Sequence, residues 1–215
     1  MATISLELCR IDDLVKLDPS LARKDFIQLQ KQAIAQHRNQ LLSASLAKDI
    51  QDDSFSKTEF GKPYLKQDSH FYFNHSHSQQ HYVLAHSHQV PDIGVDIEDL
   101  DRNVRFEALA KHAFHKQELD AWQSSGLDPE YWFKVWTLKE AVLKASGLGI
   151  RINLNELNTQ AHPQMNGGMC NHPAIGTFAY QNYVLPHAML SVAWRAEQSC
   201  KGFQLPQIEI HQRYR

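Results

Sequence analysis

Two short segments constrain this chain more than any other part of its sequence. In the first, GVDIE, acidic and apolar residues alternate, so a β-strand would place Asp96 and Glu98 together on one face. In the second, WFKVWTLKEAVLK at 132–144, Glu140 and Lys144 are four residues apart and share one face of a helix. One strand and one helix can therefore present three carboxylates and a cation, which is what a metal-assisted site for a polyphosphate requires.

Hydrophobic periodicity and turn residues predict a mixed order of helices and strands. Strands are expected over 4–8, 70–74, 82–87, 93–98 and 184–194. Helices are expected over 19–48, 103–122 and 129–146, the last one ended by glycines. Polar or glycine- and proline-containing stretches predict loops over 49–57 and 158–173. This order favours an α+β or α/β chain with two units.

Composition excludes several classes of protein. A formal net charge of −2 is unlike the broad basic field of a general nucleic-acid binder, so a polyanionic ligand must be met by a local cluster of cations. The sequence starts without a signal-peptide pattern, and no apolar stretch approaches the ~20 residues of a membrane span. Three scattered cysteines argue against a disulfide framework or a cysteine-based zinc site. We expect a soluble, cytoplasmic protein.

Four segments in a fixed order resemble the motifs of one enzyme family. They are FGKP at 60–63, FNHSHS at 73–78, GVDIE at 94–98 and WTLKEAVLK at 136–144. Together they resemble the signature of the 4′-phosphopantetheinyl transferases. The length of the chain is similar to that of the long, single-chain (surfactin-synthetase, Sfp) type rather than the short trimeric type.

The resemblance implies a fold as well as an activity. It implies two similar subdomains related by a pseudo-twofold axis, each a small sheet packed with helices, with the active site at their interface. The corresponding division of this chain is 1–100, with the first three motifs, and 101–215, with the helical motif. The single-chain type also implies a monomer.

The activity that the resemblance implies is transfer of 4′-phosphopantetheine from coenzyme A to a serine hydroxyl of an apo acyl or peptidyl carrier protein. Adenosine 3′,5′-bisphosphate would be released, and Mg²⁺, or alternatively Mn²⁺, would assist. Neither a nucleic acid nor a membrane is an expected partner. The carrier could belong to a fatty-acid, polyketide, polyunsaturated-lipid or peptide synthase, and the sequence does not distinguish these.

Three acidic residues are the candidate metal ligands. Asp96 and Glu98 lead, because Mg²⁺ prefers carboxylate oxygens shared with substrate phosphates. Glu140 is the third acid, either as a ligand or as the base that removes the serine proton. Lys144 would bind the phosphate on which charge grows as the leaving group departs. The alternative is a strand with two solvated acids and a surface ion pair between Glu140 and Lys144.

Five further residues are candidates for binding coenzyme A phosphates. Ser76 and His77 resemble the pair that the family uses for this purpose. Lys62 lies in a tight Gly-Lys-Pro turn. Arg38 resembles a basic helix position near the 3′-phosphate of the nucleotide, and Arg23 would add to it. An ordinary turn lysine and a solvated helix face are the alternatives.

Several features leave other interpretations open. Six of thirteen histidines fall between His70 and His88, a density that could mean zinc. Lys139 falls inside the apolar arc of its helix, where it either snorkels or reaches a buried acid. The acids alone would equally fit a metal-dependent phosphoesterase or nucleotidyl transferase, and a non-catalytic carrier- or zinc-binding module is a third reading. Cations and apolar residues over 102–111 predict a docking surface for the carrier.

Overall fold

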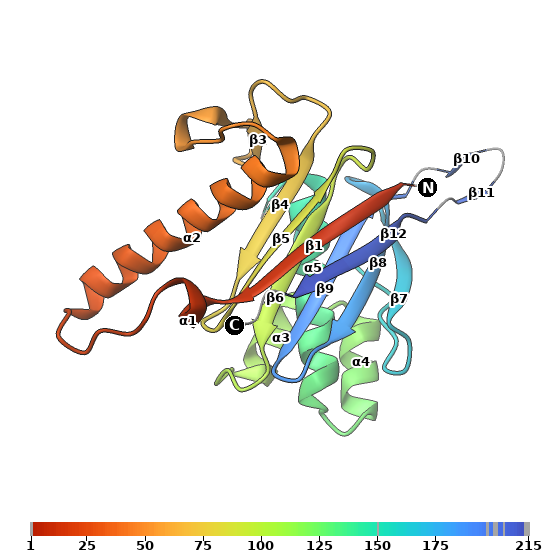
Figure 1. Ribbon diagram of the computed structural model, residues 1–215. Coiled ribbons are helices and arrows are strands. Elements are labelled where there is room, and N and C mark those ends of the chain that lie inside the picture. The colour runs from red at the N-terminus through yellow and green to blue at the C-terminus, as the bar shows by residue number, and fades with distance from the viewer. Residues whose placement is uncertain (1, 150, 197, 200–201, 204, 213–215) are drawn as a thin grey trace.

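The computed structural model describes residues 2–149, 151–196, 198–199, 202–203 and 205–212. Within these residues the chain forms two four-stranded sheets, two short hairpins and five α-helices (Figure 1). The prediction of an α+β fold built from small sheets covered by helices is confirmed.

The first sheet has the strand order β12-β1-β5-β4. Its strands are β1 (Thr3–Arg10), β4 (Tyr72–His77), β5 (His81–Ser87) and β12 (Gln207–Gln212). Only the pairing of β1 with β12 is parallel. The long helix α2 (Arg23–Leu46) covers the outer face, where Leu42 joins Phe73 and Leu84 in a buried apolar cluster. The short helix α1 (Ile11–Leu14) connects β1 to α2.

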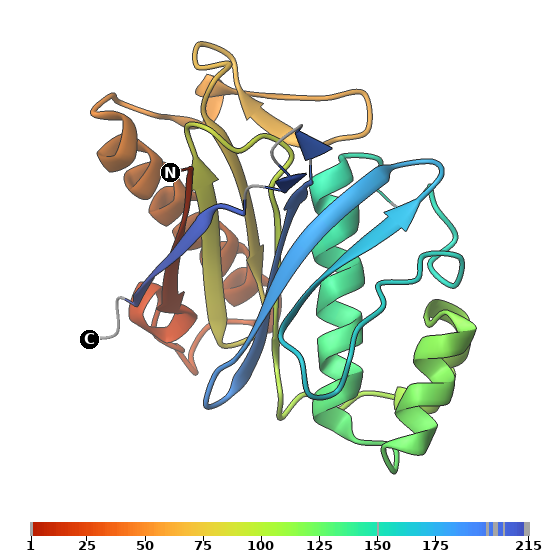
Figure 2. The same ribbon diagram turned by 90° about the vertical axis from the view of Figure 1, so that its right-hand side faces the viewer.

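The second sheet is antiparallel throughout, in the order β6-β9-β8-β7. Its strands are β6 (Gly94–Asp99), β7 (Gly167–His172), β8 (Gly176–Val184) and β9 (Ala188–Arg195). Helix α5 (Pro129–Ser146) lies along its outer face, and α3 (Phe106–Ala113) and α4 (Lys116–Ser124) flank α5 (Figure 2). Leu138 and Val142 of α5 pack with Phe178 of β8.

The inner faces of the two sheets pack against each other. Ile4 and Val83 from the first sheet share a buried cluster with Val95, Ile97 and residues of β9 from the second. The molecule is thus layered in the order α2, first sheet, second sheet, α5. Val95 and Ile97 are fully buried between the sheets, so strand alternation turns the acids of β6 the other way, toward α5.

Three predicted elements differ from the observed ones. The helix expected over 103–122 is two helices, because His115 starts α4 as its N-cap in a capping box with Glu118. The loop expected over 158–173 contains β7, whose glycines concealed its strand character. The loop expected over 49–57 contains a 3₁₀ turn, Asp52–Ser54, and the strand β2 (Phe55–Lys57), which pairs with β3 (Pro63–Leu65).

Sheet membership does not follow a division of the chain at residue 100. β6 precedes that position but pairs with β9 in the second sheet, and β12 returns from the end of the chain to pair with β1. The small hairpin of β10 (Gln198–Ser199) and β11 (Gly202–Phe203) lies on the way back. None of the helices in the described residues has the length and apolarity needed to cross a membrane.

Candidate active site

Local sequence fixes both ends of α5, the helix that carries Glu140 and Lys144. At its start the Asp128 side chain accepts hydrogen bonds from two backbone N–H groups of the first turn, with Pro129 at the first helical position. At its end Gly147 adopts φ +72°, the left-handed conformation that closes helices. The prediction of a helix over 129–146 is confirmed to the residue.

A glycine allows α5 to lie directly against β6. A Cβ atom on Gly94 would stand 2.0 Å from the carbonyl oxygen of Ala141 and 2.3 Å from the backbone nitrogen of Ala145. No side chain fits between these two backbones. The glycine of GVDIE therefore brings the acids of the strand and the polar residues of the helix to one place.

Ser76, Asp96 and Lys144 meet where β4, β6 and α5 come together. Lys144 Nζ donates to Asp96 Oδ1 at 2.7 Å and to Ser76 Oγ at 2.8 Å, and Ser76 Oγ donates to Asp96 Oδ1 at 2.8 Å. Lys144 Nζ also reaches the Val95 carbonyl oxygen at 3.2 Å. Asp96 is buried, and its second carboxylate oxygen, Oδ2, has no hydrogen-bond partner.

Two glutamates complete the acidic group around Asp96. Burial raises the pKa of Glu98, the charge of Asp96 raises it further, and a 2.6 Å ion pair with Arg102 opposes both effects. Burial also raises the pKa of Glu140, reinforced by Asp96 and Glu98 and opposed by Lys144. Asp96 is therefore close enough to both glutamates to disfavour their charge, a condition that a cation between them would relieve.

The donors fit a hard divalent cation, although they are not gathered around a single point. Within the described residues no three acidic, histidine or cysteine side chains are arranged to hold a metal. Lys144 and Arg102 instead neutralise Asp96 and Glu98. The buried, unpartnered oxygen of Asp96 and the oxygen-only donor set are nevertheless what Mg²⁺ prefers.

A cavity of about 230 Å³ opens beside this group. Lys62, Asn74, His75, Glu140 and Lys144 line it, together with Phe60 and the glycines of both neighbouring loops. Lys62 Nζ donates to the Ala145 carbonyl oxygen at 2.9 Å, which places a cation at the C-terminal end of α5. Burial lowers the pKa of Lys62 to about 8.

The remaining sequence candidates lie at different distances from the cavity. His77 is exposed, on the opposite face of β4 from Ser76. Arg38 is held by Asp52 at 3.0 Å and stacks over Phe55. Burial lowers the pKa of His75 in the cavity wall to about 4, and the charge of Arg38 lowers it further. Arg23 starts α2, about 22 Å along the helix axis from Arg38. The structure thus brings Arg38 near the site and leaves Arg23 apart from it.

Thr137 and Lys139 are polar residues of α5 that are buried. The Thr137 hydroxyl lies 2.6 Å from Ser191 Oγ. Lys139 reaches a buried acid, forming a 2.7 Å ion pair with Glu118 in which both side chains are about 1% exposed. This pair ties α4 to α5.

Sequence reasoning missed residues whose partners are distant along the chain. Asn74 is buried and its side-chain oxygen accepts the Val95 backbone N–H at 2.9 Å, which links β4 to β6. Sequence reasoning also missed a short-range partner: Arg102, expected on a docking surface, bonds Glu98 four positions away. The asparagine lies inside the FNHSHS segment, but nothing in the sequence pairs it with Val95.

Comparisons with known proteins find similarity to one enzyme family. The model of the 4′-phosphopantetheinyl transferase superfamily matches residues 92–194. The 4′-phosphopantetheinyl transferase gsp of Aneurinibacillus migulanus is 36% identical over 47% of this chain and 41% of its own length. Sfp of Bacillus subtilis is 30% identical over 57% and 54%, and psf-1 of Bacillus pumilus is 27% identical over 74% and 75%. The chain spans about half the length of the first two relatives.

The matched residues include β6 with both of its acids and the whole of α5. This segment, slightly less than half of the chain, is similar to the 4′-phosphopantetheinyl transferase superfamily.

Proposed function

We propose that this protein transfers 4′-phosphopantetheine from coenzyme A to a serine hydroxyl of an apo acyl or peptidyl carrier protein. The observation that carries the proposal is the meeting of Ser76, Asp96 and Lys144 beside Glu98 and Glu140, at the mouth of a cavity that Lys62 lines. Its relatives are named 4′-phosphopantetheinyl transferases. The protein acts as a monomer in this proposal.

Coenzyme A binds with its phosphates toward the cations of the site. Lys62 and Lys144 line the cavity from two sides and meet negative charge there. Arg38, which already affects the pKa of His75 in the cavity wall, adds positive charge near the 3′-phosphate. Ser76 donates a hydrogen bond from its hydroxyl to a phosphate oxygen. His77, at the end of β4, helps to bind the coenzyme A phosphates. Arg23 remains a weaker candidate because of its distance along α2.

Glu140 removes the proton of the carrier serine. Its raised pKa, caused first by burial and then by Asp96, brings it closer to working pH and makes it a better base than an exposed glutamate. Lys144 stabilises the negative charge that grows on the departing phosphate of adenosine 3′,5′-bisphosphate. The serine oxygen forms the new bond to the phosphorus atom of the pantetheine phosphate as the pyrophosphate linkage breaks.

Asp96, Glu98 and Glu140 would hold Mg²⁺, or Mn²⁺ in its place. When bound, the cation supplies charge neutralisation and alignment of the pyrophosphate. Lys144 would then bind the substrate phosphate in place of Asp96, and Arg102 would release Glu98. Lys144 and Arg102 have long, partly exposed side chains, so this rearrangement would cost little free energy.

The test is to incubate the protein with coenzyme A, Mg²⁺ and a panel of apo carriers, and to weigh the carriers by mass spectrometry. Addition of one 4′-phosphopantetheine to the carrier serine, absent with a Ser→Ala carrier and abolished by a chelator, is the expected result. The same panel identifies which synthase the carrier belongs to.

Two other functions make different predictions in this assay. A phosphoesterase or nucleotidyl transferase would cleave coenzyme A or a nucleotide and leave every carrier unmodified. A non-catalytic module would bind a carrier or zinc without any product. Intact acids at all three positions favour catalysis, and metal analysis of protein without an affinity tag tests the zinc reading.

A further inference from the structure

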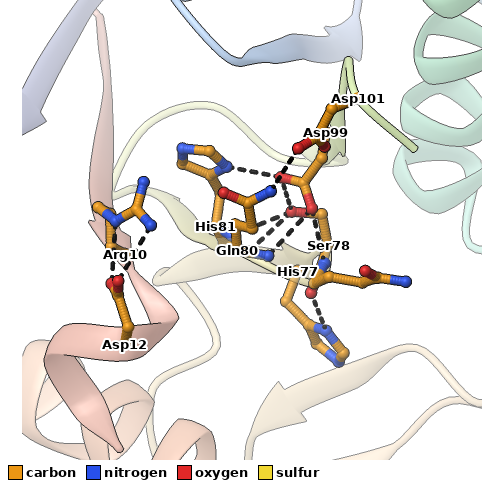
Figure 3. A network of polar contacts seen from close by, with 9 residues as sticks. Arg10, Asp12, His77, Ser78, Gln80, His81, Asp99 and Asp101 are labelled. Carbon is orange, nitrogen blue, oxygen red and sulfur yellow. Dashed lines mark hydrogen bonds and ion pairs between the residues drawn. The ribbon is translucent and has the colours of Figure 1, made fainter. Parts of the chain in front are cut away.

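One buried carboxylate, that of Asp99, accepts four hydrogen bonds from the turn between β4 and β5 (Figure 3). Ser78 Oγ lies 2.6 Å from Oδ1, and His81 Nδ1 lies 2.6 Å from the same oxygen. The backbone N–H groups of Gln79 and Gln80 donate to Oδ2 at 2.9 and 3.0 Å. Each of the two carboxylate oxygens therefore accepts two hydrogen bonds.

This arrangement is a clamp and not a catalytic triad. In a triad the serine hydroxyl bonds the imidazole, which in turn bonds the acid. Here Ser78 Oγ and His81 Nδ1 both reach the same oxygen of Asp99, side by side. The side chains of His81 and Asp99 are 5% and 3% exposed, which leaves little room for a substrate between them.

The clamp connects two strands that no backbone ladder joins. In the described strands β4 pairs with β5, and β6 pairs with β9. Two other side-chain contacts cross from β4 to β6, Asn74 to the Val95 N–H and Ser76 to Asp96. Asp99 adds the third, at the end of β6, and it is the one that makes the most bonds.

The clamp lies next to the proposed coenzyme A and metal residues on both strands. Ser76 and His77 directly precede the turn that Asp99 holds, and Glu98 directly precedes Asp99 itself. Four donors of the turn converge on the Asp99 carboxylate, so the turn is shaped to hold this side chain.

We propose that Asp99 is a positioning residue, which sets the distance between the phosphate-binding end of β4 and the acidic strand β6 by holding the Ser78–His81 turn. The proposal rests on the function proposed above. Asp99 touches neither substrate nor metal; it acts through Ser76 and Glu98, because a misplacement of about 1 Å in a reacting group can cost about a hundredfold in rate.

The decisive variant is Asp99→Asn. An amide keeps one acceptor oxygen, but its NH₂ group would face two donors, so half of the clamp is lost with almost no change in size. Asp101→Asn is the matched control, because exposed Asp101 accepts a single bond at 2.9 Å from the Gln80 side chain of the same turn. Ser78→Ala removes one of the four bonds to Asp99, together with the bond that Ser78 Oγ accepts from the His81 backbone N–H, and serves as an intermediate step.

Three measurements are made on each variant at a temperature well below its unfolding midpoint. They are kcat and KM for coenzyme A and carrier, the Mg²⁺ dependence of kcat, and hydrogen exchange of the peptide covering 72–80. We expect Asp99→Asn to lower kcat by about ten- to a hundredfold, with a higher Mg²⁺ requirement and faster exchange, Ser78→Ala to lie between, and Asp101→Asn to match the unmodified protein.

A merely structural role would lower the unfolding temperature of Asp99→Asn and leave kcat and the Mg²⁺ requirement of the folded protein unchanged. That result overturns the proposal, as does equal exchange in Asp99→Asn and Asp101→Asn. If the unmodified protein loads no carrier, the proposed function fails instead. The exchange of 72–80, together with coenzyme A affinity by calorimetry, then decides whether the clamp holds β4 in its binding position.

Discussion

Lys144 Nζ and Asp96 Oδ1 lie 2.7 Å apart although the two residues are 48 positions apart in the sequence. Their contact crosses from α5 to β6 at the place where Gly94 lets the helix approach the strand. The expected i,i+4 partner of Lys144 is Glu140, but the lysine bonds the strand instead. A surface ion pair within the helix is therefore not what these residues form, and their mutual placement depends on packing.

Replacing either acid of β6 tests the metal assignment. Asp96→Ala and Glu98→Ala should each lower turnover by at least about a hundredfold, because a ligand of the catalytic cation is lost. The fold should persist, since Val95 and Ile97 supply the packing of the strand from its other face. Carrier loading and thermal unfolding measure the two effects. Asp101→Ala, exposed in the same segment, is the control, and near-normal turnover at saturating Mg²⁺ would refute the assignment.

Glu140→Gln separates catalysis from binding. The amide keeps the size of the side chain and one coordinating oxygen but cannot accept the serine proton, so kcat should fall by about 10²- to 10⁴-fold. KM for coenzyme A should change much less. Glu130→Gln, exposed in the first turn of the same helix, should leave both constants unchanged. A rise in KM with normal kcat would make Glu140 a binding residue only.

The pKa of Lys62, lowered to about 8, predicts a pH dependence. Below this pH the side chain is a cation that attracts phosphate, and the attraction is lost as the pH rises through 8. We expect kcat/KM for coenzyme A to decline above pH 8, and Lys62→Arg to remove this decline because arginine stays charged.

The same lysine tests recognition of the 3′-phosphate. Lys62→Ala and Arg38→Ala should raise KM for coenzyme A, and should raise it much less for 3′-dephospho-coenzyme A. Lys57→Ala, exposed in the neighbouring hairpin, is the control. If both variants weaken the two substrates equally, the 3′-phosphate lies elsewhere.

The helix α3 tests carrier docking. Phe106 packs edge-on against Trp132 and Phe133, so its ring belongs to the core, whereas Arg105 and Lys111 are exposed. Arg105→Glu with Lys111→Glu should raise KM for the carrier in a salt-sensitive way and leave coenzyme A binding unchanged. Arg102 is unsuitable for this test because it bonds Glu98. An unchanged carrier KM at low ionic strength would place docking on another surface.

Gly94→Ala tests the contact that assembles the site. The added methyl group would overlap the backbone of α5, and relief requires separating helix from strand, so stability should fall by about 3 kcal/mol. Gly126→Ala is the control: its Cβ would meet nothing within 4 Å, and its φ of +77° makes a cost of about 1 kcal/mol. Chemical denaturation measures the stability of both variants. Equal losses of stability would contradict the close approach of α5 to β6.

The sequence by itself determined the elements that carry the site. The alternation of β6 separates Asp96 from Val95, and the caps at Asp128 and Gly147 fix α5, because these signals act between residues a few positions apart. The prediction of one helix over 103–122 was wrong, because His115 caps the start of a second helix within this range.

Only the tertiary structure decided which residues meet. Ser76 reaches Lys144 across 68 positions, Lys139 finds Glu118 in the core, and Asp99 holds a turn of the other sheet. Periodicity shows which face of an element is polar, but not which distant face it will oppose. That choice is made when the two sheets and their helices pack as layers, because apolar burial over whole faces, and not any single polar pair, sets how they are placed.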